Sequence, residues 1–370
     1  MAPMTEMTGP TPDPPAPGAD EAGRVLDVIM QGTVFLDIVF TGLPSLPVAG
    51  TEIYSEGMGS CPGGIANLAV ASSRLGMRTG LSAAFGDDGY ADFLWSTLAE
   101  QEGIDLSHSQ RFENWHSPVT ISMAHNRDRA MLTHEHPPPV PPAELFDVPP
   151  PARAAVVNVG SDSGGWVEKA ASNGTMLFGD VGWDPTGQWS QDVLAEIGRL
   201  TAFLPNSGEA MAYTHTEDPR AALMELAELV PVVVVTCGGQ GSIGLDGVSG
   251  EEEWVPALPV NAVDATGAGD VFAAAFIAGT LRGWSLKHRM AFSNLCSGLA
   301  VQQVGGSLAA PGWGDIADWH ARTVERSAAG SRPAHALRHT YEFLDDVVAE
   351  HAGSGAVRRA VATIARSSDA

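Results

Sequence analysis

The 370-residue chain has 20 basic and 44 acidic residues, which gives a formal net charge of −24, and 44% of its residues are hydrophobic. This apolar content predicts a globular protein, and its charge argues against nucleic acid and anionic membranes as partners, because both require a basic face. The length suits one main domain with a small appendage.

The three cysteines, Cys61, Cys237 and Cys296, are too few and too widely spaced for a disulfide framework, and we expect reduced, buried thiols. The first residues lack a basic region followed by an apolar run, so no secretory signal is expected. The longest aliphatic stretch, residues 230–235, is too short to span a bilayer. A cytoplasmic protein is the natural prediction.

Residues 1–24 are rich in proline, glycine, threonine and acid, and we predict a disordered tail there. Extended runs follow at 25–30 and 34–39, and residues 63–75 have the apolar spacing of a helix. Helix-like and strand-like segments then alternate, with helices expected at 90–102, 191–198 and 221–229 and strands at 154–159, 175–179, 201–204 and 232–236. This alternation predicts βαβ units, and therefore an α/β, Rossmann-like three-layer sandwich around a largely parallel sheet.

Two stretches interrupt the alternation. Residues 41–59 and 117–136 alternate polar and apolar side chains without helix signals, and residues 126–129 supply a turn for a hairpin. We predict that they form a small β-sheet lid that projects from the main domain. Residues 137–151 contain eight prolines and would be the stiff return path.

The C-terminal part is less regular. Apolar residues recur at helical spacing over 337–348 and again over 357–364, with a Gly-Ser-Gly break between them. We therefore predict a main domain over 25–315 and a helical extension over 316–370.

The most informative segment is Asp264-Ala265-Thr266-Gly267-Ala268-Gly269-Asp270, which runs directly into an apolar helix. The N–H groups at a helix start lack partners and attract an anion, and the small residues Gly267, Ala268 and Gly269 let a phosphate approach them. A carboxylate at Asp270 could then take the proton of an attacking hydroxyl group. The segment predicts phosphoryl transfer to an alcohol, with Asp270 as the base and residues 267–269 as the anion hole.

Two other phosphate motifs are excluded. A dinucleotide fingerprint needs a further glycine after Gly269, where Val271 and Phe272 stand instead. A Walker loop needs glycine before lysine, and neither Lys169 nor Lys287 has one.

Three further motifs occur in order before this segment. They are Gly63-Gly64-Ile65-Ala66-Asn67 (followed by Gly86-Asp87-Asp88-Gly89), Asn206-Ser207-Gly208-Glu209 and Thr236-Cys237-Gly238-Gly239-Gln240-Gly241. Together with the segment that ends at Asp270, their order and spacing resemble the ribokinase-like, or PfkB, family of carbohydrate kinases over roughly residues 25–311. The resemblance implies an ATP-dependent kinase with a Rossmann-like domain and a β-sheet lid.

The resemblance also implies roles for individual residues. Asp37, Gly63, Gly64 and Asn67 would hold the substrate, and the Asn67 amide can both donate to and accept from a sugar hydroxyl group. The nucleotide would be bound by Asn206, Thr236, Gly238, Gly241 and Asn294. Glu209 would order Mg²⁺, directly or through water, because a carboxylate near a triphosphate needs a cation between them. A monovalent cation, K⁺, would bind Asp264, Thr266, Gly305 and Ala309, largely through carbonyl oxygens.

Several alternatives stay open. A nucleoside kinase on the same fold would need an aromatic platform for the base, for which Phe35, Trp115 and Trp183 are candidates. A non-catalytic sugar sensor is another reading, although a sensor has no need of the base. An open edge of the lid favours a homodimer. His134 and His136 lie on one face of a strand, but two imidazoles are fewer than zinc requires, so no metal site is predicted there.

Overall fold

A computed structural model describes residues 25–351, except 126–127, 142–143, 147, 161–164, 183 and 185. Eight strands form the central sheet, in the order β14-β13-β12-β11-β10-β9-β1-β4. They are β1 (Leu26–Gln31), β4 (Thr79–Ser82), β9 (Ala152–Val159), β10 (Met176–Val181), β11 (Ala202–Phe203), β12 (Val232–Thr236), β13 (Ser242–Asp246) and β14 (Glu251–Val255). The six strands from β4 to β12 are parallel, and β13 and β14 extend the sheet as an antiparallel hairpin.

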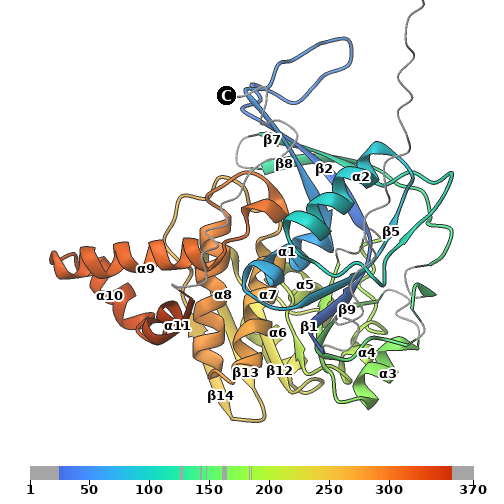
Figure 1. Cartoon of the computed structure of the whole chain (residues 1–370). Coiled ribbons are helices and arrows are strands. Elements are labelled where there is room, and N and C mark those ends of the chain that lie inside the picture. Colours follow the sequence, from blue (N-terminus) through green and yellow to red (C-terminus); the bar gives the residue numbers. More distant parts are fainter. Residues whose placement is uncertain are drawn as a thin grey trace, which may run out of the picture.

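Helices cover both faces of this sheet, which gives the predicted three layers (Figure 1). On β12, Val232 and Val234 pack into the core with the helices α1 and α7, whereas Val233 and Val235 pack into the core with α6. Such continuous valine runs occur where a parallel strand is buried on both faces. One face carries α1 (Ala66–Arg74), α2 (Gly89–Trp95), α7 (Ala268–Leu281) and α8 (Leu286–Ala300), and the other carries α3 (Trp166–Ser172), α4 (Leu194–Ile197), α5 (Ser207–Thr214) and α6 (Pro219–Ala227).

A second sheet, which we call the lid, projects from one end of the molecule (Figure 1). Its order is β3-β2-β7-β8, with β2 (Val34–Thr41), β3 (Gly57–Gly64), β7 (Val119–His125) and β8 (Asp128–His134). Short elements complete the body: β5 (Ala84–Phe85), β6 (Gln110–Arg111), a π-helix at Ser96–Gln101 and 3₁₀ turns η3 (Gly238–Gln240) and η4 (Gly306–Ala309).

The first half of the lid differs from the prediction. Strands were expected within residues 41–59, but β2 and β3 flank this segment, and residues 42–56 between them form no strand. The helix expected from Gly63 begins at Ala66 instead, since Gly63 and Gly64 still belong to β3. A strand as rich in glycine as β3 has little propensity of its own and forms through pairing with β2.

The C-terminal region also differs in detail. It contains α9 (Trp313–Ala328), α10 (Arg332–Thr340) and α11 (Leu344–His351), so the single helix expected over 337–348 is broken at residues 341–343. Trp313, Ile316, Tyr341 and Leu344 belong to the main core. The predicted tail (1–24) and the second predicted helix (357–364) lie outside the described residues. Within the described ranges, no helix has both the length and the apolar character that a bilayer crossing requires.

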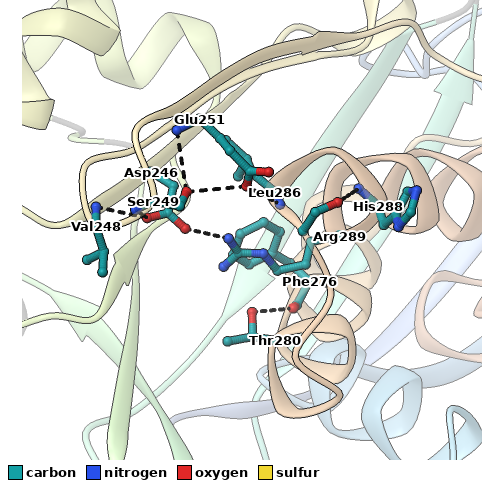
Figure 2. Close-up of polar contacts among 10 residues, drawn as sticks. Asp246, Val248, Ser249, Glu251, Phe276, Thr280, Leu286, His288 and Arg289 are labelled. Carbon is teal, nitrogen blue, oxygen red and sulfur yellow. Dashed lines mark hydrogen bonds and ion pairs between the residues drawn. The ribbon is translucent and has the colours of Figure 1, made fainter.

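A buried ion pair fixes the β13–β14 hairpin against the helices (Figure 2). The Asp246 carboxylate accepts a bond from Arg289 of α8 at 2.5 Å, and its other oxygen accepts the N–H groups of Val248 and Ser249. The Arg289 guanidinium also lies over the Phe276 ring of α7. Burial opposes ionisation of Asp246, but the Ser249 N–H and Arg289 outweigh it, so its pKa lies below the ordinary value.

We predict that Arg289→Met lowers the free energy of unfolding by about 3–5 kcal/mol, because it leaves the Asp246 carboxylate buried and unpaired. The double variant Asp246→Asn/Arg289→Met should recover at least half of that loss, since neither charge is then stranded. Urea unfolding at pH 7 measures both changes. The folded pKa of Asp246 is lowered, so the stability that its ionised form contributes is lost as the pH falls below the ordinary range of an aspartate. The destabilisation caused by Arg289→Met should therefore become smaller at low pH.

The exposed pair of Arg220 and Glu252 is the matched control, with side chains 66% and 46% exposed. Arg220→Met should cost no more than about 1 kcal/mol. Equal losses for the two single variants would contradict the importance assigned to the buried pair.

Candidate active site

The predicted base and the predicted substrate amide meet at one end of the sheet. Asp270 lies in the first turn of α7, and Asn67 lies in the first turn of α1. The Asn67 Nδ2 atom donates a hydrogen bond to Asp270 Oδ2 at 3.1 Å. Although 203 residues separate them, the structure thus brings together the motif at 63–67 and the motif at 264–270.

The start of α7 has the form expected of an anion-binding turn. Gly267 is the N-cap, with φ 74° and ψ 5°, a left-handed conformation that a residue with a Cβ rarely adopts. A Cβ at Gly267 would meet Asn67 Cγ at 3.3 Å, whereas a Cβ at Gly269 would meet nothing within 4 Å. The Ala268 N–H already donates to Ala265 O at 3.2 Å, so Gly267 and Gly269 are the better placed donors of the predicted anion hole.

Burial raises the pKa of Asp270 to about 6, and the hydrogen bond from Asn67 lowers it in part. A carboxylate with this pKa is still mostly ionised at pH 7 and is a stronger base than an exposed aspartate. The Asn67 Oδ1 atom is buried and has no hydrogen-bond partner among the described residues. An unsatisfied buried acceptor beside a perturbed carboxylate suits a ligand that donates a hydroxyl hydrogen.

Asp37 lies on β2, opposite Cys61 of β3, and only 7% of it is exposed. A Cβ on Gly63 would meet the Asp37 carboxyl group at 2.1 Å, so this carboxyl group occupies the space that Gly63 leaves. Gly64 has φ 62°, and a Cβ there would meet Thr33 O at 2.4 Å. The predicted substrate residues therefore form one wall, built from β2, β3 and α1.

A third carboxylate, which the sequence analysis missed, joins this end of the sheet. Burial raises the pKa of Asp180, at the end of β10, well above its ordinary value, and the charges of Glu209 and Asp270 raise it further. Burial also raises the pKa of Glu209. A polar residue at the carboxyl end of a buried parallel strand is the signal that could have identified Asp180. Either a proton or a cation among these acidic groups would relieve their repulsion.

Asn206 and Glu209 are also structural residues of α5. The Asn206 side chain accepts the Glu209 N–H at 3.0 Å, and Glu209 Oε2 accepts the Asn206 N–H at 3.1 Å. This reciprocal capping box satisfies two N–H groups of the helix start. It holds the Glu209 side chain at the N-terminus of α5, where a positive helix end favours anions.

A cavity of about 410 Å³ lies beside the α7 turn, between the β12–β13 loop and α8. Its lining is mostly small or apolar and includes Thr236, Gly238, Gly239, Gly241, Leu258, Pro259, Val260, Ala268, Gly269, Phe272, Asn294 and Gly298. Four of the five predicted nucleotide residues line it; Asn206 does not, although it pairs with Thr236 across a single β-bridge. A largely apolar cavity beside a helix N-terminus suits a base with a phosphate tail.

Asn294 contributes to this cavity in a different way from that expected. Its Nδ2 group donates to Ser242 Oγ at 3.1 Å and to Val255 O at 3.0 Å, and only 7% of the residue is exposed. The Asn294 amide therefore fastens α8 to the β13–β14 hairpin and shapes the wall of the cavity.

The residues predicted to hold a monovalent cation lie in two adjoining loops. Asp264 Oδ1 accepts the Thr266 N–H and hydroxyl group, whereas the buried Asp264 Oδ2 has no hydrogen-bond partner within the described part of the chain. On the other loop, the Gly305 carbonyl oxygen already accepts the Leu308 N–H. The Arg74 guanidinium donates to Leu308 O and Ala310 O, on either side of Ala309, and so holds that loop. It also forms a buried, bidentate ion pair with Glu102.

The thiols lack the character of nucleophiles, and Trp115 is not exposed as a stacking platform. Burial raises the pKa of all three thiols, as expected of reduced cysteines that are not nucleophiles. Trp115 is buried against Phe112 and donates to His136 O, so it is not an open platform for a base. Trp183 lies outside the described residues, and Phe35 is half-buried beside Gly64.

Comparison with known proteins identifies the family of the chain. The family model for pfkB family carbohydrate kinases matches residues 45–312. A fructokinase from Klebsiella pneumoniae is 28% identical over 301 residues, which cover 70% of this chain and 93% of the relative. A nucleoside kinase from Methanothermobacter thermautotrophicus is 28% identical over 306 residues, with 78% and 94% covered.

Solved structures agree on the fold. A putative ribokinase II from E. coli, in complex with ATP and Mg²⁺, superposes with a TM-score of 0.65 at 20% identity, over 77% of this chain and 96% of that one. The chain therefore belongs to the pfkB family of carbohydrate kinases, phosphotransferases with an alcohol group as acceptor, and has the ribokinase-like fold.

Proposed function

We propose that this enzyme transfers the γ-phosphoryl group of ATP to a hydroxyl group of a sugar or sugar-like substrate, with Asp270 as the base. The observation that carries the proposal is the position of a carboxylate with a raised pKa in the first turn of α7, directly after a left-handed glycine cap. In that position one helix start supplies both a base for the hydroxyl group and N–H donors for the transferred phosphate.

The acceptor hydroxyl group would lie against Asn67. The Asn67 Nδ2 group holds Asp270. The Asn67 Oδ1 atom, which has no hydrogen-bond partner among the described residues, would accept the hydrogen of a neighbouring substrate hydroxyl group, so that the proton of the acceptor hydroxyl is left for Asp270. The Asp37 carboxylate would accept further hydroxyl groups on the same wall. Asp270 would take the proton as the new O–P bond forms, and the Gly267 and Gly269 N–H groups would stabilise the charge on the phosphoryl oxygens. Closure of the lid would exclude water, which competes as an acceptor.

The donor set also suits the cations that the family implies. Asp180 and Glu209 would hold Mg²⁺, directly or through water, and the ion would neutralise charge on the phosphates when bound. The unpartnered Asp264 Oδ2 atom, with nearby carbonyl oxygens, would bind K⁺ and stiffen the turn before α7. The base and ribose of ATP would occupy the 410 Å³ cavity between the β12–β13 loop and α8.

The identity of the acceptor is tested by a coupled ADP-release screen over pentoses, hexoses, phosphorylated sugars and nucleosides. We expect turnover with a sugar or sugar-like acceptor. Turnover with nucleosides alone would favour the alternative function of a nucleoside kinase. The similarity to a nucleoside kinase is the reason for including nucleosides in the screen. ATP binding without turnover of any acceptor would favour a sensor.

For the best acceptor of that screen, Asp270→Asn should lower turnover by about 10²–10⁴ and leave ATP binding nearly unchanged. In the unaltered enzyme, kcat/KM should fall about tenfold for each pH unit below about pH 6, because the base must be ionised and its pKa is about 6. Near-normal turnover by the variant would remove the proposed base.

The same variant should fold more stably at neutral pH. The pKa of Asp270 is raised by folding, so ionisation of this carboxyl group destabilises the fold increasingly between the ordinary aspartate pKa and about pH 6. The asparagine side chain of the variant carries no charge, and we expect a gain of about 1–3 kcal/mol at pH 7 that disappears near pH 4. Thermal unfolding at the two pH values measures it.

Gly269→Ala separates phosphate binding from folding. An added Cβ meets nothing within 4 Å, and alanine favours a helix over glycine, so the melting temperature should stay equal or rise. The methyl group would instead occupy the space assigned to the phosphate, and kcat/KM for ATP should fall at least tenfold. Full activity in this variant would contradict the assignment of the anion hole.

Asp180→Asn and Glu209→Gln test the magnesium assignment. Each should raise the Mg²⁺ concentration needed for half-maximal turnover by about tenfold or more, with partial recovery at saturating Mg²⁺. Glu228→Gln, an exposed acid on the surface, is the control and should leave this concentration unchanged. An unchanged Mg²⁺ requirement in both site variants would exclude these carboxylates as ligands.

A further inference from the structure

Three histidines that the kinase chemistry does not use converge where the lid joins the body. His134 ends β8, His136 follows it, and His116 comes from the segment before β7. Each histidine offers one ring nitrogen, and these three nitrogens lie within 4.8 Å of one another. The ring centroids are 4.9 Å apart in all three pairs. His134 and His136 alone did not predict a metal site, because two imidazoles are too few. The fold brings His116 to them as the third imidazole.

The spacing of the nitrogens matches that of ligands on one metal ion. The Nε2 atoms of His116 and His134 are 3.3 Å apart. Two imidazole nitrogens bound tetrahedrally at the usual zinc distance are about 3.3–3.4 Å apart. One ring nitrogen of the exposed His136 lies within 4.8 Å of both, and this side chain would move closer to complete the group.

Hydrogen bonds orient the ligands in the way that metal sites require. His116 Nδ1 lies 3.3 Å from Ser117 O, which can only accept. With a proton on Nδ1 to donate to it, the Nε2 lone pair of His116 faces His134 Nε2, and an ion would displace the proton that these two Nε2 atoms share. The Trp115 Nε1 group donates to His136 O at 3.3 Å and ties that residue to the same segment.

The two sides of the cluster belong to different parts of the molecule. The segment with His116 is held to the body, because the Ser117 N–H donates to Asp88 and the Gly86 N–H donates to Ser117 Oγ. His134 pairs with Val119, at the end of the β7–β8 ladder opposite the pair of His125 and Asp128. An ion shared by these side chains would join the root of the lid to the body.

We propose that His116, His134 and His136 form a binding site for Zn²⁺ or a similar first-row transition-metal ion, and that the bound ion clamps the root of the lid. Three neutral imidazoles suit zinc, copper, nickel or cobalt rather than Mg²⁺, which prefers oxygen ligands. Three protein ligands leave one tetrahedral position for water. The net charge of −24 favours the approach of any cation. This site is separate from the magnesium and potassium sites proposed above.

The test uses the full chain after removal of metal with EDTA. One equivalent of Co²⁺ should produce the visible absorption of a four-coordinate cobalt–nitrogen centre, and Zn²⁺ should displace it at one ion per chain. Competition with a fluorescent chelator then gives the Zn²⁺ affinity. Hydrogen exchange with and without Zn²⁺ should show slower exchange in β7 and β8 when the ion is bound.

His116→Gln and His134→Gln should each lower the Zn²⁺ affinity at least tenfold and abolish the change in exchange. His335→Gln, on the exposed face of α10, is the matched control and should alter neither. Failure of the unaltered protein to take up Co²⁺, or uptake that survives both site variants, would overturn the metal site. Tight binding without slower exchange in β7 and β8 would overturn the clamp.

Discussion

The left-handed turn at Gly267 is the constraint on which the rest of the site depends. It ends the loop that contains Asp264 and starts α7 beside Asn67 and at the edge of the 410 Å³ cavity. Residues 271–279 of this helix are buried without exception. Because the helix is packed on all sides, its position along its axis is fixed, and so is the position of Asp270 relative to α1.

Electrostatics is organised around that turn. The chain has a large excess of acid, yet Asp180, Glu209 and Asp270 are brought together where phosphates would bind. Such an arrangement costs stability in the absence of cations, since burial raises the pKa of each of these carboxyl groups and the charges of Glu209 and Asp270 raise that of Asp180 further. The proposed ions would offset this cost. In the proposed site, charge on the phosphates would be met by backbone N–H groups, metal ions or arginine, which agrees with the near absence of lysine.

The lid and the substrate wall are parts of one sheet. Strand β2 carries Asp37 and pairs with β3 on one side and with β7 on the other, where Asp37 lies opposite Thr120. A displacement of β7 therefore moves the carboxylate that would hold the sugar. An ion at His116, His134 and His136 would fix β7 at its root, so the histidine cluster and the sugar site would be mechanically connected through Thr120.

The sequence by itself determined the layers and the reactive turn. Runs such as Val232–Val235 and the glycines before α7 specify local structure through backbone and burial preferences that need no distant partner. The pairing of β3, the raised pKa of Asp180 and the position of the third histidine depend on contacts across the fold. The strand pairing that stabilises β3, the burial that perturbs Asp180 and the approach of His116 to His134 all arise between segments far apart in the chain. The local sequence pattern does not predict which distant segments will make such contacts.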